Sequence, residues 1–300
     1  MLAVRNLLNA LPARMPLPRP RFGQVGRTFA WAAAGAFAFA YLALTIASAW
    51  PGAREAASGG APAGGTASEL AMLRASVLWL ALAVPAGVLL WLAERAPAVG
   101  LIRMPPRRLL TASCAVFCLA EAPMFFIGAA FELVRSHSQT VASYSGTGTG
   151  STLWGDAAAS VAAGISEEIV VLVLPVLAAR RIAQAVVGVR LRRAGAVALV
   201  LVLVVARLSY HLEYGLAVVS LVPWAAVCVL LYLRSGTVLP FMVAHAAYDI
   251  ALALVNRIAA HHGFAVAVMA FTAVAAAVVV GALAVGRTAR HSIPEGSSRS

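Results

Sequence analysis

Two adjacent glutamates, Glu167 and Glu168, lie inside the stretch 164–175, which is otherwise apolar enough to cross a bilayer. An ionisable side chain at the centre of a membrane helix costs roughly 2.5–3.5 kcal/mol on insertion scales, and such residues usually face the protein interior or a water-filled cavity. Two carboxylates in a row therefore indicate a functional site. The alternative is a structural, ion-paired cluster that holds helices together.

Two further pairs of polar residues interrupt later apolar stretches, and the members of each pair are four residues apart. They are Arg207 with His211 and His245 with Asp249. On a helix this spacing places both side chains on one face, so each helix can present two polar groups to a common cavity. Carboxylates and imidazoles together can polarise a water and stabilise an oxyanion. Glu121, in another apolar stretch, is expected to pair with Arg207 or to line the same cavity.

The composition is that of a membrane protein, because 62% of the 300 residues are hydrophobic, 11% are charged and the mean hydropathy is +0.88. Soluble domains contain roughly 25% charged residues. A formal net charge of +12 would suggest nucleic acid in a soluble chain, but all 23 basic residues are Arg, and most lie in short segments between apolar runs. This arrangement orients a chain in a membrane. We therefore expect a multi-pass protein of the cell membrane whose partners include lipid and not nucleic acid.

The apolar runs predict an all-α transmembrane bundle of about eight spans. These spans cover approximately residues 28–50, 71–92, 109–134, 156–179, 194–211, 216–233, 237–255 and 264–285. This topology places eighteen arginines on the side of both termini, four on the other side and Arg207 within a span. The positive-inside rule then puts both termini in the cytoplasm. Ala47-Ser48-Ala49 fits a signal-peptidase site, but the preceding run is longer than an ordinary signal core, which favours an uncleaved span.

The same reading divides the chain into four parts. Residues 1–27 form a basic cytoplasmic tail, 28–150 hold the first three spans with their outer loops, 151–257 form the catalytic membrane core, and 258–300 contain the last span and a second cytoplasmic tail. The polar stretch 144–151, within the outer loop 135–155, is too irregular to span and could cover an entrance.

Three motifs together resemble those of a known family. They read Glu167-Glu-Ile-Val-Val-Leu172, Arg207-Leu-Ser-Tyr-His211 and His245-Ala-Ala-Tyr-Asp249. Their order, spacing and position on apolar helices are similar to the Glu-Glu-x-x-x-Arg, Phe-x-x-x-His and His-x-x-x-Asn/Asp motifs of the CPBP intramembrane proteases. That family includes the type II CAAX prenyl endopeptidases and the Abi-type proteins. The resemblance covers roughly residues 155–255, and the first three spans do not contribute to it.

The resemblance has two departures, because Leu172 stands where the family usually has Arg and Arg207 stands where it usually has Phe. One hypothesis is that Arg207 supplies from its own span the guanidinium that the Glu167–Leu172 motif lacks, and pairs with Glu168. The alternative is a decayed motif in a protein that cleaves nothing.

The resemblance implies a peptidase that hydrolyses a peptide bond of a membrane-associated or lipidated peptide or protein substrate. By position, Glu167 would be the general base and His211 would assist it, while His245 and Asp249 would position the water or hold the oxyanion. Glu168 is counted with these catalytic residues, and Arg207 and Glu121 with the supporting ones. We expect no cofactor. Zinc bound by Glu167, His211 and His245 is the alternative, although the chain lacks the His-Glu-x-x-His helix of zincins.

Two other functions compete with the peptidase, because buried Glu, His, Asp and Arg also form proton relays. These are a proton-coupled transporter and a silent membrane scaffold or immunity-type protein. The inverted repeats that many transporters show are not found in the sequence. One geometric problem remains for the peptidase. At 1.5 Å per residue His211 lies about 27 Å along its span from Arg193, so a shared site requires this span to be tilted, displaced or started below the membrane.

Overall fold

The computed structural model describes residues 23–57, 69–94, 100–101, 104–137, 152–185 and 189–291, and these are helical with no strand among them. Within these ranges, six helices are long and apolar enough to cross a membrane, and two shorter apolar helices cover Ala194–Ser209 and Ala265–Gly281. Together these eight segments confirm the predicted all-α bundle of about eight spans. The predicted entrance loop at 144–151 and the ends at 1–22 and 292–300 lie outside the described residues.

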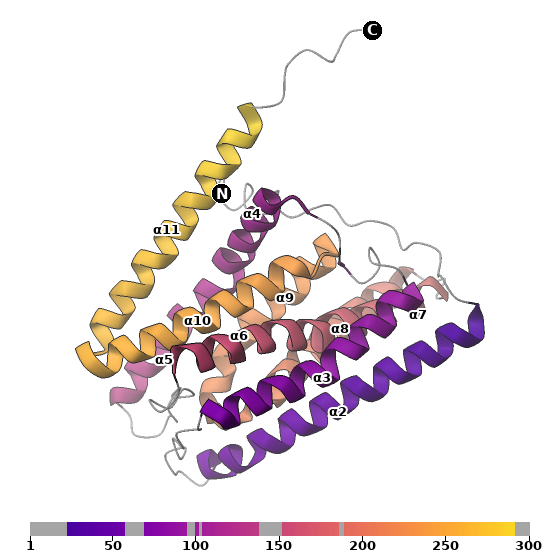
Figure 1. Cartoon of the computed structure of the whole chain (residues 1–300), viewed down its shortest axis with the longest axis horizontal. Coiled ribbons are helices and arrows are strands. Elements are labelled where there is room, and N and C mark those ends of the chain that lie inside the picture. The colour runs from indigo at the N-terminus through magenta and orange to yellow at the C-terminus, as the bar shows by residue number, and fades with distance from the viewer. Residues whose placement is uncertain are drawn as a thin grey trace.

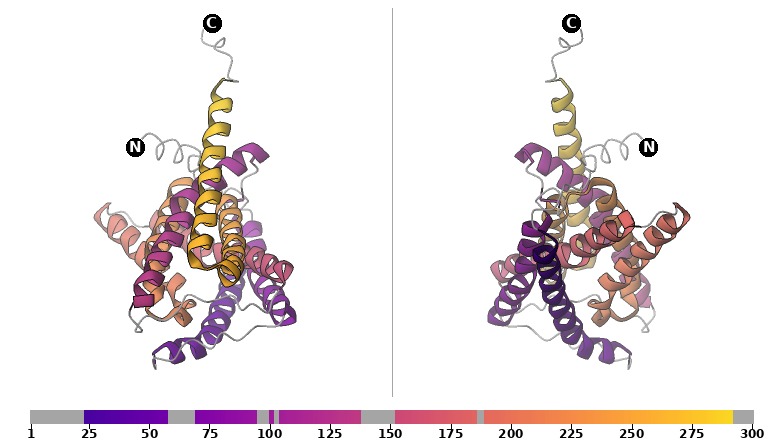
Figure 2. Two further views of the ribbon diagram at one scale, coloured as in Figure 1. Left: turned by 90° about the vertical axis from the view of Figure 1, so that its left-hand side faces the viewer. Right: turned by 90° about the vertical axis from the view of Figure 1, so that its right-hand side faces the viewer.

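The helices follow one another in a simple up-and-down order. Their bounds are α2 Gln24–Ala57, α3 Glu69–Glu94, α4 Pro106–Val116, η1 Phe117–Glu121, α5 Ala122–His137, α6 Leu153–Glu167, η2 Glu168–Val173, α7 Leu174–Ala185, α8 Val189–Ser209, η3 Leu212–Leu221, α9 Val222–Ser235, α10 Leu239–His262 and α11 Phe264–His291. Figure 1 shows α2, α3, α6 and α10 side by side, with α4 and α11 crossing their direction steeply and α11 extending beyond the others toward the C-terminus, as the side views of Figure 2 confirm.

This order gives the bundle two ends. At one end, which we call the cavity end, α2 and α10 finish and α3 and α6 begin; it is the lower left of Figure 1. Thr152 donates a hydrogen bond to Glu69 there, which ties the start of α6 to the start of α3. At the opposite end, the arginine-rich end, α2, α8 and α10 begin and α3 and α7 finish. There the Gly100 carbonyl accepts a hydrogen bond from the backbone N–H of Val238, which joins the loop after α3 to the start of α10.

Two spans contain a π-helical turn, and in each case a proline explains its position. η1 ends at Glu121, two residues before Pro123, and η2 ends at Val173, two residues before Pro175. Proline removes an N–H from the helix ladder and its ring crowds the carbonyl four residues earlier, so the preceding turn widens. Both widened turns contain buried glutamates, Glu121 and Glu168.

The predicted C-terminal boundary of the span 194–211 is wrong, because the helix ends two residues earlier. α8 finishes at Ser209, and His211 only caps a ten-residue 3-10 helix, η3, which leads into α9 through Pro223. A 3-10 segment of this length is uncommon. Arg207 and His211 therefore do not share one helical face, and the problem of bringing His211 to the site is solved by the chain leaving the helix before it.

Close packing of α6 on α10 depends on a glycine. A Cβ on Gly164 would lie 2.8 Å from the carbonyl oxygen of Met242 and 3.0 Å from the backbone nitrogen of Ala246. Only a residue without a side chain allows the two backbones to approach this closely. Glu167 lies three residues after Gly164 on α6, and His245 lies between Met242 and Ala246 on α10. The close contact at Gly164 therefore sets the distance between the glutamates and His245.

Candidate active site

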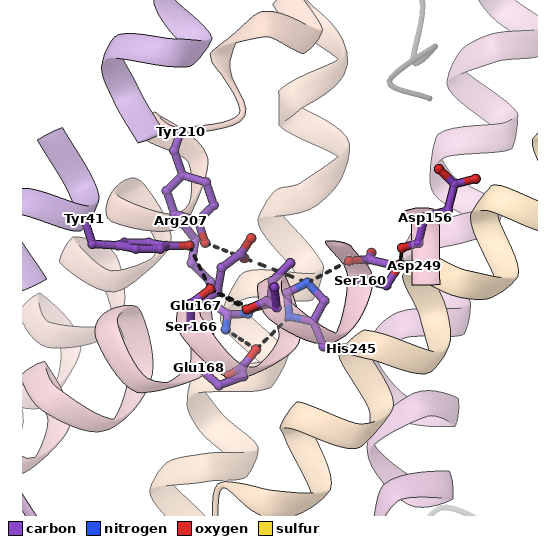
Figure 3. Close-up of polar contacts among 12 residues, drawn as sticks. Tyr41, Asp156, Ser160, Ser166, Glu167, Glu168, Arg207, Tyr210, His245 and Asp249 are labelled. Atoms are coloured by element: carbon purple, nitrogen blue, oxygen red, sulfur yellow. Dashed lines mark hydrogen bonds and ion pairs between the residues drawn. The ribbon is translucent and has the colours of Figure 1, made fainter. Parts of the chain in front are cut away.

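The two neighbouring glutamates have separate surroundings. Glu167 is the last residue of α6 and Glu168 the first of the π turn, and successive positions on a helix point about 100° apart. Glu167 faces a cavity, whereas Glu168 points into the bundle and is fully buried. Figure 3 shows the two carboxylates on different sides of His245.

Glu168 forms the ion pair with Arg207 that the sequence suggested. An Arg207 Nη2 atom donates to Glu168 Oε1, and both side chains are buried, with at most 1% of either exposed. The same carboxylate oxygen lies 3.0 Å from His245 Nδ1. Because a carboxylate paired with a guanidinium is a hydrogen-bond acceptor, Nδ1 carries the proton and donates it to Glu168. Glu168 thus links Arg207 on α8 to His245 on α10.

The other ring nitrogen of His245 faces two carboxylates. Nε2 lies 3.8 Å from Glu167 Oε2 and 3.6 Å from Asp249 Oδ2. His245 and Asp249 are therefore on one face of α10, as their spacing predicted. The structure brings together Glu167, Glu168, His245, Asp249 and Arg207 around one imidazole.

A cavity of about 370 Å³ reaches this cluster. Glu167, His245 and Asp249 contribute to its lining, and so does His211, while Glu168, Arg207 and Glu121 do not. Spans outside the family motifs also form its walls, through Tyr41 on α2 and Trp79 on α3. Such a volume falls in the range of ligand-binding pockets, roughly 300–1,000 Å³.

Three aromatic residues at the site were not singled out in the sequence. Tyr210 donates a 2.7 Å hydrogen bond to Glu167 Oε2. Trp224 packs beneath the Arg207 guanidinium, 4.5 Å from its ring centroid, and meets the His245 ring edge-on at 5.6 Å. Tyr41 accepts a hydrogen bond from Ser166. Tyr210 stands beside His211 in the second motif, which was a signal for it, but Tyr41 and Trp224 are distant in sequence from any motif.

Glu121 lies outside the cavity lining, whereas His211 lines the cavity as expected. Arg207, the proposed partner of Glu121, pairs with Glu168 instead, and Glu121 does not line the cavity. Its Oε2 atom is buried and has no hydrogen-bond partner among the described residues. The ring of His211 stacks on Tyr214, 5.3 Å between centroids, at the side of the cavity.

The side chains do not fit the alternative zinc site. In the described part of the chain, no three His, Cys, Asp or Glu side chains come together as metal ligands, and His245 Nδ1 is already engaged by Glu168. A structural or catalytic zinc needs at least three such donors. We therefore derive no step through a metal, and the absence of a cofactor stays a prediction.

Fold and cluster together define a polytopic membrane protein with a buried Glu–His–Asp centre below a cavity. Residues 149–251, about a third of the chain, match the family model described as type II CAAX prenyl endopeptidase Rce1-like. This match confirms the resemblance to the CPBP intramembrane proteases that the three motifs predicted. No curated protein and no solved structure matches the chain.

Proposed function

We propose that this protein is an intramembrane endopeptidase of the cell membrane, which uses Glu167 as the general base that activates water. The observation that carries the proposal is that Glu167 Oε2 lies 3.8 Å from His245 Nε2 at the base of a cavity. Polar atoms at this separation can both contact one water molecule at about 2.8 Å. A water in that position is next to a carboxylate that can accept its proton.

The reaction then follows ordinary acid–base steps. As the water oxygen attacks the carbonyl carbon of the scissile peptide bond, Glu167 removes the water proton. The tetrahedral intermediate collapses when the carboxyl group of Glu167 passes that proton to the leaving amide nitrogen. His245 and Asp249 position the water, because both face the same point from α10 and can accept a hydrogen bond from its second O–H.

Glu168 and Arg207 act through His245. The carboxylate holds Nδ1–H, so the ring presents Nε2 to the cavity, and the guanidinium balances the carboxylate charge. A base that is oriented by a third group is a recurring arrangement in hydrolytic sites. Tyr210 fixes the Glu167 carboxylate in the same way. His211 assists from the cavity wall, and Glu121 takes no step in this mechanism.

The departure at Leu172 favours an active enzyme over a decayed motif. Leu172 is fully buried in the hydrophobic core, while Arg207 delivers a guanidinium to Glu168 from another helix. The charge partner of the glutamate pair is thus kept although its position in the sequence has changed. The kept pair also leaves Glu168 in position to accept from His245, as an intact site requires.

The test is proteolysis of an unbiased library of membrane peptides by the purified full chain in lipid. We expect Glu167→Gln and His245→Ala each to lower cleavage at least about 100-fold, the lower end of the contribution of general acid–base catalysis. His261→Ala, at the exposed end of α10, is the matched control and keeps wild-type cleavage. Each protein is also assayed with a strong chelator, which we expect to change nothing.

Three results would contradict the proposal. If folded wild-type protein cleaves no peptide, or if Glu167→Gln retains cleavage, a transporter or silent scaffold explains the buried polar cluster better. Loss of cleavage on chelation would replace the metal-free mechanism with a metal-dependent one.

A further inference from the structure

Two antiparallel helices, α6 and α10, form opposite walls of the cavity with residues at the same helical spacing. α6 contributes Asp156, Ser160, Ala163 and Glu167, and α10 contributes His245, Asp249, Leu252 and Asn256. Both sets follow the spacing i, i+4, i+7, i+11, which is one continuous stripe of a helix. Because the helices run in opposite directions, Asp156 lies opposite the Asn256 end of α10, and Glu167 lies opposite His245.

The length of the two stripes gives the depth of the cavity. Eleven residues separate Asp156 from Glu167 and His245 from Asn256, and at 1.5 Å per residue each stripe is about 16 Å long. An extended chain covers at most about 3.3–3.6 Å per residue. A segment of about five extended residues therefore reaches from the mouth to the Glu167 carboxylate.

The mouth lies at the cavity end of the bundle. Ser48 near the end of α2 and Met72 near the start of α3 belong to the lining, together with Asp156 and Asn256. Arg257 bonds Asp156 across the mouth at 2.7 Å, so the outer parts of α6 and α10 are fastened to each other there.

The distribution of arginine orients this end in the membrane. Of the arginines in the described helices, Arg54, Arg74, Arg135 and Arg257 lie toward the cavity end, whereas eleven lie toward the opposite end. Arginine-rich ends of membrane proteins remain in the cytoplasm. The mouth therefore opens on the side of the membrane away from the cytoplasm.

The charge of the lining restricts what enters. Among the described residues, the cavity wall contains the carboxylates of Asp156, Glu167 and Asp249 and no arginine, and the chain has no lysine. Arg257 balances Asp156, whereas at the base two carboxylates, Glu167 and Asp249, face the single imidazole of His245, which can balance at most one of them. An acidic side chain or a free C-terminal carboxylate next to the scissile bond would meet like charge, which is unfavourable by several kcal/mol when desolvated.

We infer that the cavity admits, from the non-cytoplasmic face of the membrane, an extended and non-acidic internal peptide segment of about five residues. The substrate class is thus a polypeptide that has already been exported or that presents a segment at the outer membrane boundary. A C-terminal tripeptide processed on the cytoplasmic side does not fit this class. This inference rests on the proposed peptidase function, but the direction of access is testable without it.

The direction of access is measured by labelling the full chain in intact cells with a charged, membrane-impermeant maleimide. Asn256→Cys reports the mouth, and Arg234→Cys, exposed at the end of α9, reports the arginine-rich end. Wild type, whose three cysteines lie in membrane helices, gives the background. We expect Asn256→Cys to be labelled in intact cells and Arg234→Cys only after permeabilisation. Ser48→Cys provides a second reporter of the mouth.

The reverse labelling pattern would overturn the direction of access, whatever the purified protein cleaves. Selectivity is measured separately with pairs of peptides from a cleaved library sequence, identical except for Lys or Glu two residues from the scissile bond. We expect the Lys peptide to be cleaved at least about tenfold faster, because like charges inside a site are repelled. Equal rates would overturn the charge selectivity. Absence of any cleavage in the purified protein would remove the proposed function but leave the labelling result standing.

Discussion

Among the described residues, two ion pairs join a buried glutamate to an arginine, one at the arginine-rich end and one beside the cavity. At the arginine-rich end, Glu94 on α3 accepts from Arg181 on α7 and, through its other oxygen, from the Trp31 indole at 2.9 Å. Beside the cavity, Glu168 accepts from Arg207 and from His245 with the same oxygen. Both glutamates are fully buried.

The two pairs differ in the third side chain that contacts the glutamate and in the exposure of the arginine to solvent. The Trp31 indole N–H only donates, so the Glu94 network ends there. The His245 imidazole has a second nitrogen, which faces the cavity. Arg181 is 22% exposed and Arg207 is not exposed at all. A buried ion pair in a membrane protein can therefore be a clamp or part of a site, and the third contact decides which.

Glu168→Gln is the sharpest way to break this comparison and has the largest expected effect. It leaves Arg207 buried without a counter-charge, which costs about 3–5 kcal/mol of stability. It also replaces the charged acceptor that orients His245 with a neutral amide that Arg207 contacts as well, so cleavage by the remaining folded protein falls at least about 100-fold. Unfolding in detergent and peptide cleavage measure the two effects. The double variant Glu168→Gln/Arg207→Leu should recover part of the stability and none of the activity; recovery of activity would show that the pair is only a clamp.

Gly164→Ala tests whether helix approach sets the site geometry. The added methyl must push α6 from α10, because it would lie 2.8 Å from the Met242 carbonyl oxygen. A misplacement of about 1 Å can lower catalysis about 100-fold, and we expect a loss of this size. Gly128→Ala on α5 is the control, since no atom lies within 4 Å of its added Cβ. Equal activity of the two variants would contradict the argument.

Glu94→Gln should give the opposite result to Glu168→Gln. The glutamine still accepts from Trp31, and Arg181 can reach solvent, so the loss of stability is about 1–3 kcal/mol. Cleavage per folded molecule stays within about twofold of wild type, because distant sites act independently. A loss of cleavage comparable with that of Glu168→Gln would show that the two pairs are coupled.

Tyr210→Phe should have the smallest effect of the three changes beside the cavity. It removes one hydrogen bond to Glu167 and leaves the carboxylate in place. Hydrogen bonds to charged groups contribute about 1.5–3 kcal/mol, of which only part bears on the transition state, so we expect about a tenfold loss of cleavage. Tyr232→Phe, whose ring packs on Phe241 away from the cavity, is the control.

Much of the site could be predicted from the sequence because its strongest signals are local. Charges inside apolar runs are expensive, so Glu167 and His245 stood out immediately, and a spacing of four placed Asp249 beside His245. The contact of Arg207 with Glu168 was predicted because a buried carboxylate needs a counter-charge and few cations lie within the spans. The extension of one helix to His211 was wrong, because nothing in that apolar run marks its end at Ser209.

The sequence by itself determined the number of apolar segments, the family that the membrane core resembles and the ionisable residues that are buried within the spans. All of these follow from composition and from spacing along the chain. Only the tertiary structure decided which glutamate faces the cavity, that Tyr41, Tyr210 and Trp224 join the site, and that Glu121 does not line the cavity. These contacts depend on how closely helices that are distant in sequence approach one another. Gly164 and the π turn before Pro175 fix that approach, and no local pattern shows which partners it brings together.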